Sequence, residues 1–232
     1  MNLFARFGSI ALFVAAFMTT AAMAQQALVV GRDYTLVNPP QATDSGKKVE
    51  ALELFWYGCP HCYHVEPALK AWLKKKPADV EFKSIPGTFG SPTWEPLTRT
   101  FYALDAMGLA AKYHDVLFAA IHEEKDANKQ RALVSDPRTI ADFLASKGAD
   151  KQKFLDAYNS FAVNGKTKRS EDLTRAYDVP GTPAFGVDGK YLTSPSNFPN
   201  PNGSVNYDRF FQVLDQLIAQ ARKERAGGSA KK

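Results

Sequence analysis

The segment from residue 49 to residue 76 constrains the fold most, because an apolar strand runs into a helix through a pair of cysteines. Residues 49–57 (VEALELFWY) form an apolar run of strand length. Residues 63–76 (YHVEPALKAWLKKK) carry apolar side chains at helical spacing. The junction is Gly58-Cys59-Pro60-His61-Cys62. Cys59 is therefore expected at the N-terminus of the helix, with Pro60 at the first helical position, where the N–H that proline lacks would have no partner.

The spacing of the two cysteines favours reactivity over structural cross-linking. A disulfide that closes a four-residue loop stabilises a fold by about 1.9 kcal/mol, against about 4.7 kcal/mol for a loop of about 100 residues. Unpaired N–H groups and the helix dipole stabilise a thiolate at a helix N-terminus, and His61 adds a possible donor or positive charge. We therefore expect Cys59 to be the exposed, acidic sulfur and Cys62, one turn further in, to be the buried resolving sulfur.

Haem and zinc are the alternatives to redox chemistry at this motif. A c-type haem requires histidine directly after the second cysteine, and position 63 is tyrosine. Zinc has four nearby candidate ligands, Cys59, His61, Cys62 and His64. His61, however, lies between the cysteines, where it can scarcely share a tetrahedral ion with both, and His114 and His122 stand alone in apparently helical sequence. The motif thus indicates a redox dithiol that needs no metal and no cofactor.

The N-terminus has the three parts of a secretory signal peptide. A short region with one basic residue, Arg6, precedes an apolar run at 9–18 and the site Ala22-Met23-Ala24. A membrane anchor is the alternative, but a spanning helix needs about 20 apolar residues, and Thr19-Thr20 interrupts this one. We expect cleavage after Ala24 and an exported, soluble protein.

Charge gives no sign of a nucleic-acid partner. The formal net charge is +5, which becomes +4 when Arg6 is removed with the signal peptide, and the basic residues are dispersed among acidic ones. The one dense run, Lys74-Lys75-Lys76, directly precedes Pro77. Lysines complement the negative end of a helix about to stop, so the run is interpreted as a helix end and not as a binding patch.

The rest of the chain predicts an α/β domain interrupted by helices. Residues 78–85 predict a second strand, parallel to the first. Residues 184–187 and 190–193 predict a hairpin with Asp188-Gly189 at the turn, and 206–223 a final helix. Between these parts helical patterns dominate, at 94–107, 109–124, 136–147, 150–161 and 166–177. We therefore expect a redox domain of residues 25–92 and 166–225, an all-helical insertion domain at 93–165, and a disordered tail at 226–232.

Three features together carry a family resemblance: Cys59-Pro60-His61-Cys62, the stretch Val179-Pro180-Gly181-Thr182-Pro183 before the hairpin, and the helical insertion. They resemble the DsbA family of periplasmic thiol:disulfide interchange proteins in the thioredoxin superfamily. The resemblance implies a thioredoxin fold with an all-helical insertion domain. It also implies an enzyme that donates its Cys59–Cys62 disulfide to newly exported, unfolded proteins. This family is itself a reference case for an acidic thiol and an oxidising couple, so those properties come with the resemblance.

The resemblance also implies roles for residues outside the motif. Pro183 would be cis and pack beside the disulfide, and the backbone of Thr182 would pair with an extended substrate. The Thr182 hydroxyl, where other members have valine, could tune the redox poise. Glu53 aligns with a buried acid whose raised pKa would let it exchange a proton with Cys62, although a solvent-facing position, as expected for Glu50, stays open. Glu66 matches a family acid, and a solvated helix position stays open for it.

Partners and competing functions follow from the same resemblance. It implies reoxidation by a DsbB-type quinone-linked membrane oxidase, and we expect a monomer. A thiol reductase or isomerase is the main competing enzyme, although no spare segment could supply an isomerase's dimerisation domain. A peptide-binding chaperone with incidental or zinc-binding cysteines is the competing non-enzyme. Four aromatic residues are expected either to rim a groove for peptide or to belong to the core: Trp56, Tyr57, Phe89 and Trp94.

Overall fold

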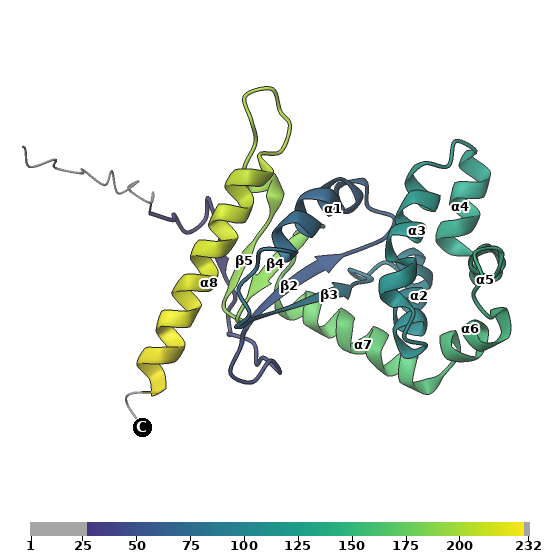
Figure 1. Cartoon of the computed structure of the whole chain (residues 1–232), viewed down its shortest axis with the longest axis horizontal. Coiled ribbons are helices and arrows are strands. Elements are labelled where there is room, and N and C mark those ends of the chain that lie inside the picture. The colour runs from purple at the N-terminus through teal and green to yellow at the C-terminus, as the bar shows by residue number, and fades with distance from the viewer. Residues whose placement is uncertain (1–26, 230–232) are drawn as a thin grey trace, which may run out of the picture.

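A five-stranded sheet forms the centre of the computed structural model, which describes residues 27–229 (Figure 1). The predicted signal peptide and its cleavage site lie outside the described residues. The strand order is β1-β5-β4-β2-β3, in which β2 and β3 are parallel and the other pairs antiparallel. The strands are β1 (Thr35–Leu36), β2 (Val49–Phe55), β3 (Val80–Pro86), β4 (Ala184–Val187) and β5 (Tyr191–Thr193).

The predicted strand-helix-strand unit is present, with the cysteines where the chain turns from β2 into α1 (Pro60–Leu73). Cys59 is the residue that precedes the helix, and Pro60 takes the first helical position, as expected. The helix ends before the lysine run, and Lys76 Nζ donates to the carbonyl of Val80 over 2.8 Å. This contact agrees with the interpretation of the run as a helix end.

Strand β2 is buried on both faces. Its side chains alternate between the two faces, and this alternation determines which face of the sheet Glu53 lies on. Val49 and Ala51 lie in the core beneath α1 and α8 (Tyr207–Ser229). Leu52 and Leu54 lie in a second core on the opposite face of the sheet. Because Glu53 is in phase with Val49 and Ala51, it faces α1 and the cysteines.

The helical part lies beyond the β3 edge of the sheet (Figure 1). It contains one helix, α4, that the sequence analysis did not predict. A single buried side chain, Leu133, holds α4 against its neighbours, so its apolar pattern is weak, although Asp126 caps its first turn. The elements of this part are η1 (Pro92–Trp94), α2 (Glu95–Ala106), α3 (Ala110–His122), α4 (Ala127–Ser135), α5 (Pro137–Ser146), α6 (Lys151–Tyr158) and α7 (Phe161–Ala176).

Helix α7 belongs to both parts of the molecule. Val163 in its first turn lies in the core of the helical part, whereas Leu173 packs against the core under the sheet. Ser170, between them, donates a hydrogen bond to the carbonyl of Pro86 at the end of β3. The expected boundary at 165/166 therefore falls inside one continuous helix. Its buried face carries serine and threonine besides Val163, which hid the continuity from the apolar pattern.

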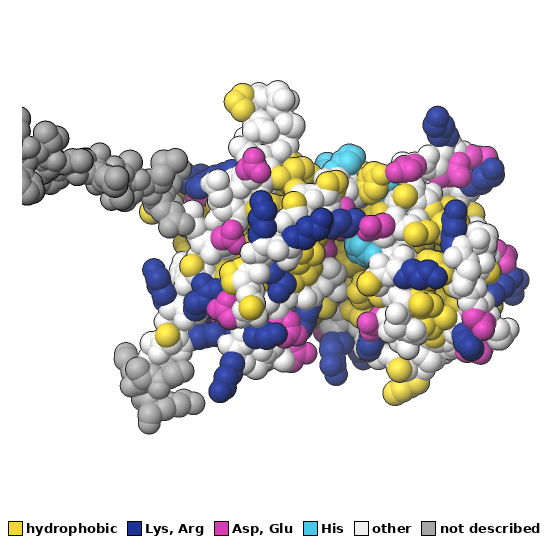
Figure 2. All heavy atoms as spheres, viewed as in Figure 1, with side chains coloured by type: hydrophobic (Ala, Val, Ile, Leu, Met, Phe, Trp, Pro, Cys, Tyr) yellow, Lys and Arg dark blue, Asp and Glu magenta, His cyan; other side chains and the backbone are white. Residues whose placement is uncertain are grey.

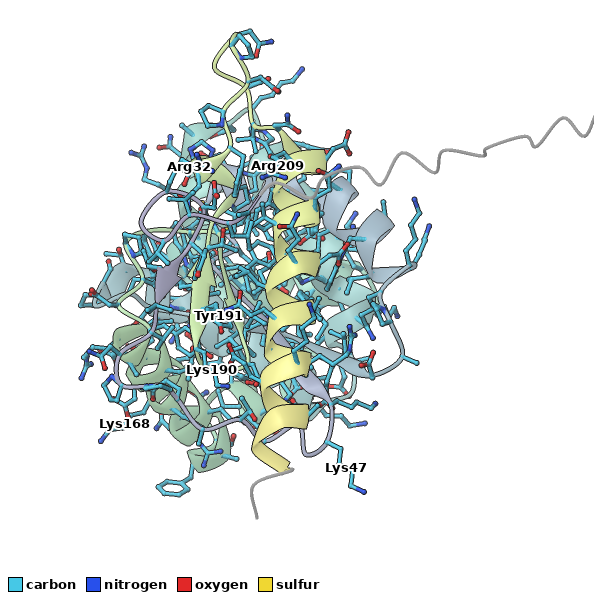
Figure 3. The ribbon with its side chains drawn as sticks, turned by 90° about the vertical axis from the view of Figure 1, so that its left-hand side faces the viewer. Arg32, Lys47, Lys168, Lys190, Tyr191 and Arg209 are labelled. Atoms are coloured by element: carbon cyan, nitrogen blue, oxygen red, sulfur yellow. The ribbon has the colours of Figure 1, made fainter. Side chains whose placement is uncertain are left out.

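The C-terminal part differs from expectation in two details. Val187 pairs with Tyr191, so the hairpin loop has three residues (188–190) and not two. Helix α8 continues to Ser229, into the segment expected to be disordered. Its last turns are tied to the sheet, since Lys190 and Tyr191 both contact Glu224. Figure 3 shows Lys190 and Tyr191 beside α8. The short strand β1, which pairs with β5, was also not predicted. Within residues 27–229, no helix combines the length and apolar character that crossing a membrane requires.

Candidate active site

Cys59 and Cys62 lie at the N-terminal end of α1 as two unbridged thiols. Cys62 is fully buried, as expected, but Cys59 is only 9% exposed and is thus far less accessible than the sequence analysis expected. The loop before β4 covers it, and the Thr182 carbonyl lies 3.3 Å from the Cys59 sulfur. The sequence separation of 123 residues between these groups explains why the motif alone did not reveal the cover.

The environment of Cys59 stabilises its thiolate. A hydrogen bond from the Cys62 thiol is the largest influence that lowers the pKa of Cys59, to about 5, and the Thr182 side chain contributes further. The backbone N–H groups of His61 and Cys62, exposed at the start of the helix, act in the same direction. Burial opposes these effects without cancelling them.

The environment of Cys62 has the opposite effect. Burial raises the pKa of Cys62 well above its usual value, and the hydrogen bond it gives to Cys59 and the charge of Glu53 raise it further. At neutral pH the pair therefore consists of a thiolate on Cys59 and a thiol on Cys62. Of two sulfurs one helical turn apart, one is a good leaving group and the other holds its proton.

The Thr182–Pro183 peptide bond is cis, as the resemblance implied. Beside it lies a groove of about 420 Å³, whose walls include His61 together with Thr182 and Pro183. His61 and Pro60 are both exposed, and His61 thus connects the dithiol with the groove. Ser194 Oγ donates to the carbonyl of Pro183 over 2.8 Å and ties the cis-proline loop to the end of the hairpin.

Glu53 is fully buried beneath this site. Burial is the main cause that raises its pKa to about 8, and the charge of Glu66 adds to the effect. The hydroxyl of Ser84 donates to Glu53 Oε2 over 3.1 Å. Glu53 Oε1 has no hydrogen-bond partner among the described residues. The solvent-facing alternative is thereby excluded for Glu53, and it is excluded for Glu50 as well, which is 5% exposed.

Glu66 is buried and has partners, so the solvated alternative is excluded for it too. Its Oε1 lies 3.1 Å from His114 Nε2, and its Oε2 lies 3.5 Å from Lys70 Nζ. The other ring nitrogen of His114 lies 3.0 Å from the Tyr57 hydroxyl. Asp115 also lies close enough to share a cation with Glu66 and His114. The Lys70 ammonium contacts both carboxylates, however, and already supplies the positive charge.

His114 and Ser84 also lie beside the site, and neither was predicted from the sequence. No local motif marks either residue, and only the packing of α3 and β3 against α1 and β2 brings them there. The four aromatic residues divide between the two expectations: Tyr57 is fully buried in the core, whereas the other three are partly exposed. Trp56 stacks on Trp94 with ring centroids 4.1 Å apart, and Phe89 meets Trp94 edge-on.

Two neighbouring thiols of such unequal acidity, held under a cis-proline loop, meet the requirements of thiol-disulfide exchange. The fold and the site therefore define a disulfide oxidoreductase built on the thioredoxin fold. Residues 53–214 match the model of the DSBA-like thioredoxin domain, and the chain belongs to this family.

Relatives and solved structures agree with that assignment. The thiol:disulfide interchange protein DsbA of Burkholderia cepacia is 39% identical over 196 residues, which span 84% of this chain and 86% of that protein. The crystal structure of Pseudomonas aeruginosa DsbA is 38% identical and superposes with a TM-score of 0.72, covering 88% of this chain and 97% of that one. The oxidoreductase DsbA from Xylella fastidiosa is 28% identical, with a TM-score of 0.73 and coverages of 84% and 98%. The expected family, fold class and enzyme class are thereby confirmed.

Proposed function

We propose that the protein donates its Cys59–Cys62 disulfide to reduced, unfolded proteins in the periplasm. The observation that carries this direction is the acidity of Cys59, whose pKa is lowered to about 5. A stable thiolate favours the reduced enzyme, so the disulfide form gives up its bond readily. A reductase would need a more stable disulfide form and a less acidic thiol. The acidity of Cys59 therefore disfavours the alternative of a reductase or isomerase.

The chemistry is two successive thiol-disulfide exchanges. A substrate thiolate attacks the Cys59 sulfur, the Cys59–Cys62 bond breaks, and Cys62 leaves with the electron pair and takes up a proton, for which Glu53 is the nearby buried acid. A second substrate thiolate then attacks the substrate sulfur of the mixed disulfide, and Cys59 leaves as a stable thiolate. The substrate loses two electrons and gains a disulfide, and the enzyme is left as a dithiol.

Substrate binding is assigned to the groove beside Pro183. An extended chain would pair with the backbone of Thr182, and the walls of the groove would contact its side chains. His61 would face the incoming sulfur, with Pro60 beginning the helix that holds it. Loose backbone recognition of this kind suits unfolded polypeptides of varied sequence.

The setting of the reaction rests on the sequence and on the family. The signal peptide expected at residues 1–24 would direct the chain to the periplasm, where disulfides persist. A DsbB-type quinone-linked membrane oxidase would restore the Cys59–Cys62 disulfide after each cycle. The protein would act as a monomer, without metal or cofactor.

The test is to mix the oxidised protein, in stoichiometric amount, with a reduced, unfolded protein that has two cysteines. We expect the test protein to lose two thiols per enzyme molecule, as counted by alkylation and mass spectrometry, and Cys59→Ser to lower the rate by more than about 10³-fold because the attacked sulfur is gone. Thiolate absorbance of the reduced enzyme should titrate near pH 5. Full oxidation by Cys59→Ser would contradict the proposal, and bound zinc with no oxidation would favour the chaperone.

A further inference from the structure

The buried carboxyl of Glu53 has one side-chain hydrogen bond among the described residues, and it comes from Ser84. The two residues are directly paired in the parallel register of β2 and β3. Ser84 is only partly buried, because β3 is the edge strand of the sheet. Its hydroxyl therefore touches the buried acid on one side while the residue itself reaches the molecular surface.

The surface that Ser84 reaches is a cavity of about 390 Å³ between α1, α3 and β3, lined by apolar and ionisable side chains. Glu66 and His114 line the same cavity, with Glu66 Oε1 and His114 Nε2 3.1 Å apart. Lys70 and Asp115 stand at its rim, joined by a contact of 2.6 Å. Figure 2 shows histidine, acidic and basic side chains gathered where α1 meets the helical part. The cavity thus places proton-carrying groups near the Ser84 hydroxyl.

The reaction creates a demand for a proton inside the protein. When the disulfide opens, Cys62 becomes a thiolate in a fully buried position, and Glu53 is the buried acid that can protonate it. The carboxylate left behind would face the Glu66 carboxylate and the Cys59 sulfur, both of which disfavour its charge. Lys83, the cation next to Ser84 on β3, contacts Glu50 and not Glu53. Glu53 must therefore regain a proton before the next cycle.

We propose that Ser84 is a positioning residue that carries protons between Glu53 and the cavity lined by Glu66 and His114. A hydroxyl can donate its own proton to the Glu53 carboxylate while it accepts another from the cavity side, so no charge is left on Ser84. When the disulfide is made again, the same steps run in reverse and release the Cys62 proton. The inference rests on the proposed function, because it requires Cys62 to leave and return during disulfide transfer.

The test compares Ser84→Ala with a matched control, Ser45→Ala. Ser45 donates to a second buried glutamate of β2, Glu50, over 2.7 Å, so its loss removes the same kind of bond far from the cysteines. The rate of repeated turnover, with a dithiol peptide and oxidised glutathione both in excess, is measured from pH 5 to pH 9 in H₂O and D₂O, because Glu53 must regain its proton in every cycle. The carboxyl titration of Glu53 is followed by infrared spectroscopy.

Ser84→Ala should slow repeated turnover about ten-fold below pH 7, less than the ~10²–10⁴ of a fully positioned acid because other solvent paths remain. It should also raise the solvent isotope effect, because the slowed proton step then limits the rate, and move the Glu53 titration to higher pH, because the Ser84 hydrogen bond lowers that pKa. Ser84→Thr, which keeps the hydroxyl, should restore both values, and Ser45→Ala should match the wild type.

Identical pH profiles and isotope effects for Ser84→Ala, Ser45→Ala and the wild type would overturn the inference while leaving the proposed function in place. Failure of the wild-type protein to oxidise the peptide would instead remove the proposed function. Slow transfer by both alanine variants to the same extent would indicate a general loss of stability and would also count against a proton path through Ser84.

Discussion

Glu50 and Glu53 are buried on the same strand, but they differ in their hydrogen-bond partners and in the charges around them. Glu50 accepts from Ser45 over 2.7 Å and from the Lys83 ammonium over 2.8 Å, so it has a neutral and a cationic partner, although burial still raises its pKa. Among the described residues, Glu53 has one neutral side-chain hydrogen bond, and the charges that act on it are acidic. A buried carboxyl with no cation beside it destabilises the fold whenever it ionises. Such a residue fits a role in proton transfer better than a structural role.

Glu53 should make the oxidised protein less stable as pH rises. Its pKa is about 8 in the folded protein against 4.5 for a glutamate in water, so between these values the folded state binds more protons than the unfolded state. The free energy of unfolding must then fall with rising pH, by about 3–4 kcal/mol between pH 5 and pH 8. Glu53→Gln should flatten this dependence in urea denaturation of the oxidised protein, in which neither cysteine titrates.

Glu81→Gln is the matched control for that measurement, since it removes a partly exposed glutamate from the neighbouring strand. It should keep the wild-type slope of unfolding free energy against pH. A Glu53→Gln variant with the same slope as the wild type would show that Glu53 ionises normally.

Helix α7 joins the helical part to the core under the sheet. Ser160 begins it, and the Ser160 side chain accepts a hydrogen bond from the N–H of Val163 over 3.2 Å. The three residues that follow this cap in the buried stripe, Thr167, Ser170 and Thr174, are polar. Helix α7 therefore depends on its hydrogen bonds more than an apolar helix of the same length would.

Ser160→Ala should lower the free energy of unfolding by about 1 kcal/mol, the usual loss for an N-cap serine. The midpoint of urea denaturation should fall while the slope stays constant, because the folded surface does not change. Ser146→Ala, at an exposed serine at the end of α5, should leave the midpoint unchanged. Equal midpoints for both variants would mean that the cap of α7 contributes nothing.

At the scale of the whole molecule, the redox site and the helical part share one core. Phe55 and both cysteines belong to the same buried cluster as residues from α2 to α7. Phe118 on α3 lies at its centre, with its ring 4.9 Å from the Tyr57 ring and 5.0 Å from the His114 ring. The site is therefore supported by the helical part, and the two should unfold together.

Phe118→Ala should cost about 3–5 kcal/mol of unfolding free energy, because it removes a fully buried ring. Far-UV circular dichroism and alkylation of Cys62 should report the same transition midpoint, since the site and the helices share this core. The control is Phe161→Ala, whose side chain is 92% exposed and whose loss should change stability by less than about 0.5 kcal/mol. Alkylation of Cys62 well before the helices melt would show that the parts are independent.

Local sequence patterns predicted the elements whose apolar residues repeat at strand or helix spacing. The family resemblance supplied site features that depend on contacts between distant segments of the chain. Strand β2, helix α1 and the position of Cys59 were predicted correctly from the sequence around them. The two-residue strand β1 was missed because its pairing with β5 connects distant segments. Three features depend on contacts between segments that are far apart in the sequence: the loop over Cys59, the burial of Glu50, and the positions of Ser84 and His114 beside the site. No pattern within one segment specifies such contacts.

The continuity of α7 has a consequence for anyone who wishes to transplant the helical part into a relative. A cut at 165/166 would sever a helix whose first turn and last turn lie in different cores. The joints should instead be placed at the turn in residues 87–91, where the chain leaves β3, and after Ala176, where Asp178 adopts a positive φ. The transplanted segment is then longer than the helices that lie outside the sheet. It includes the end of α7, which packs against the core under the sheet and thus belongs to the redox domain.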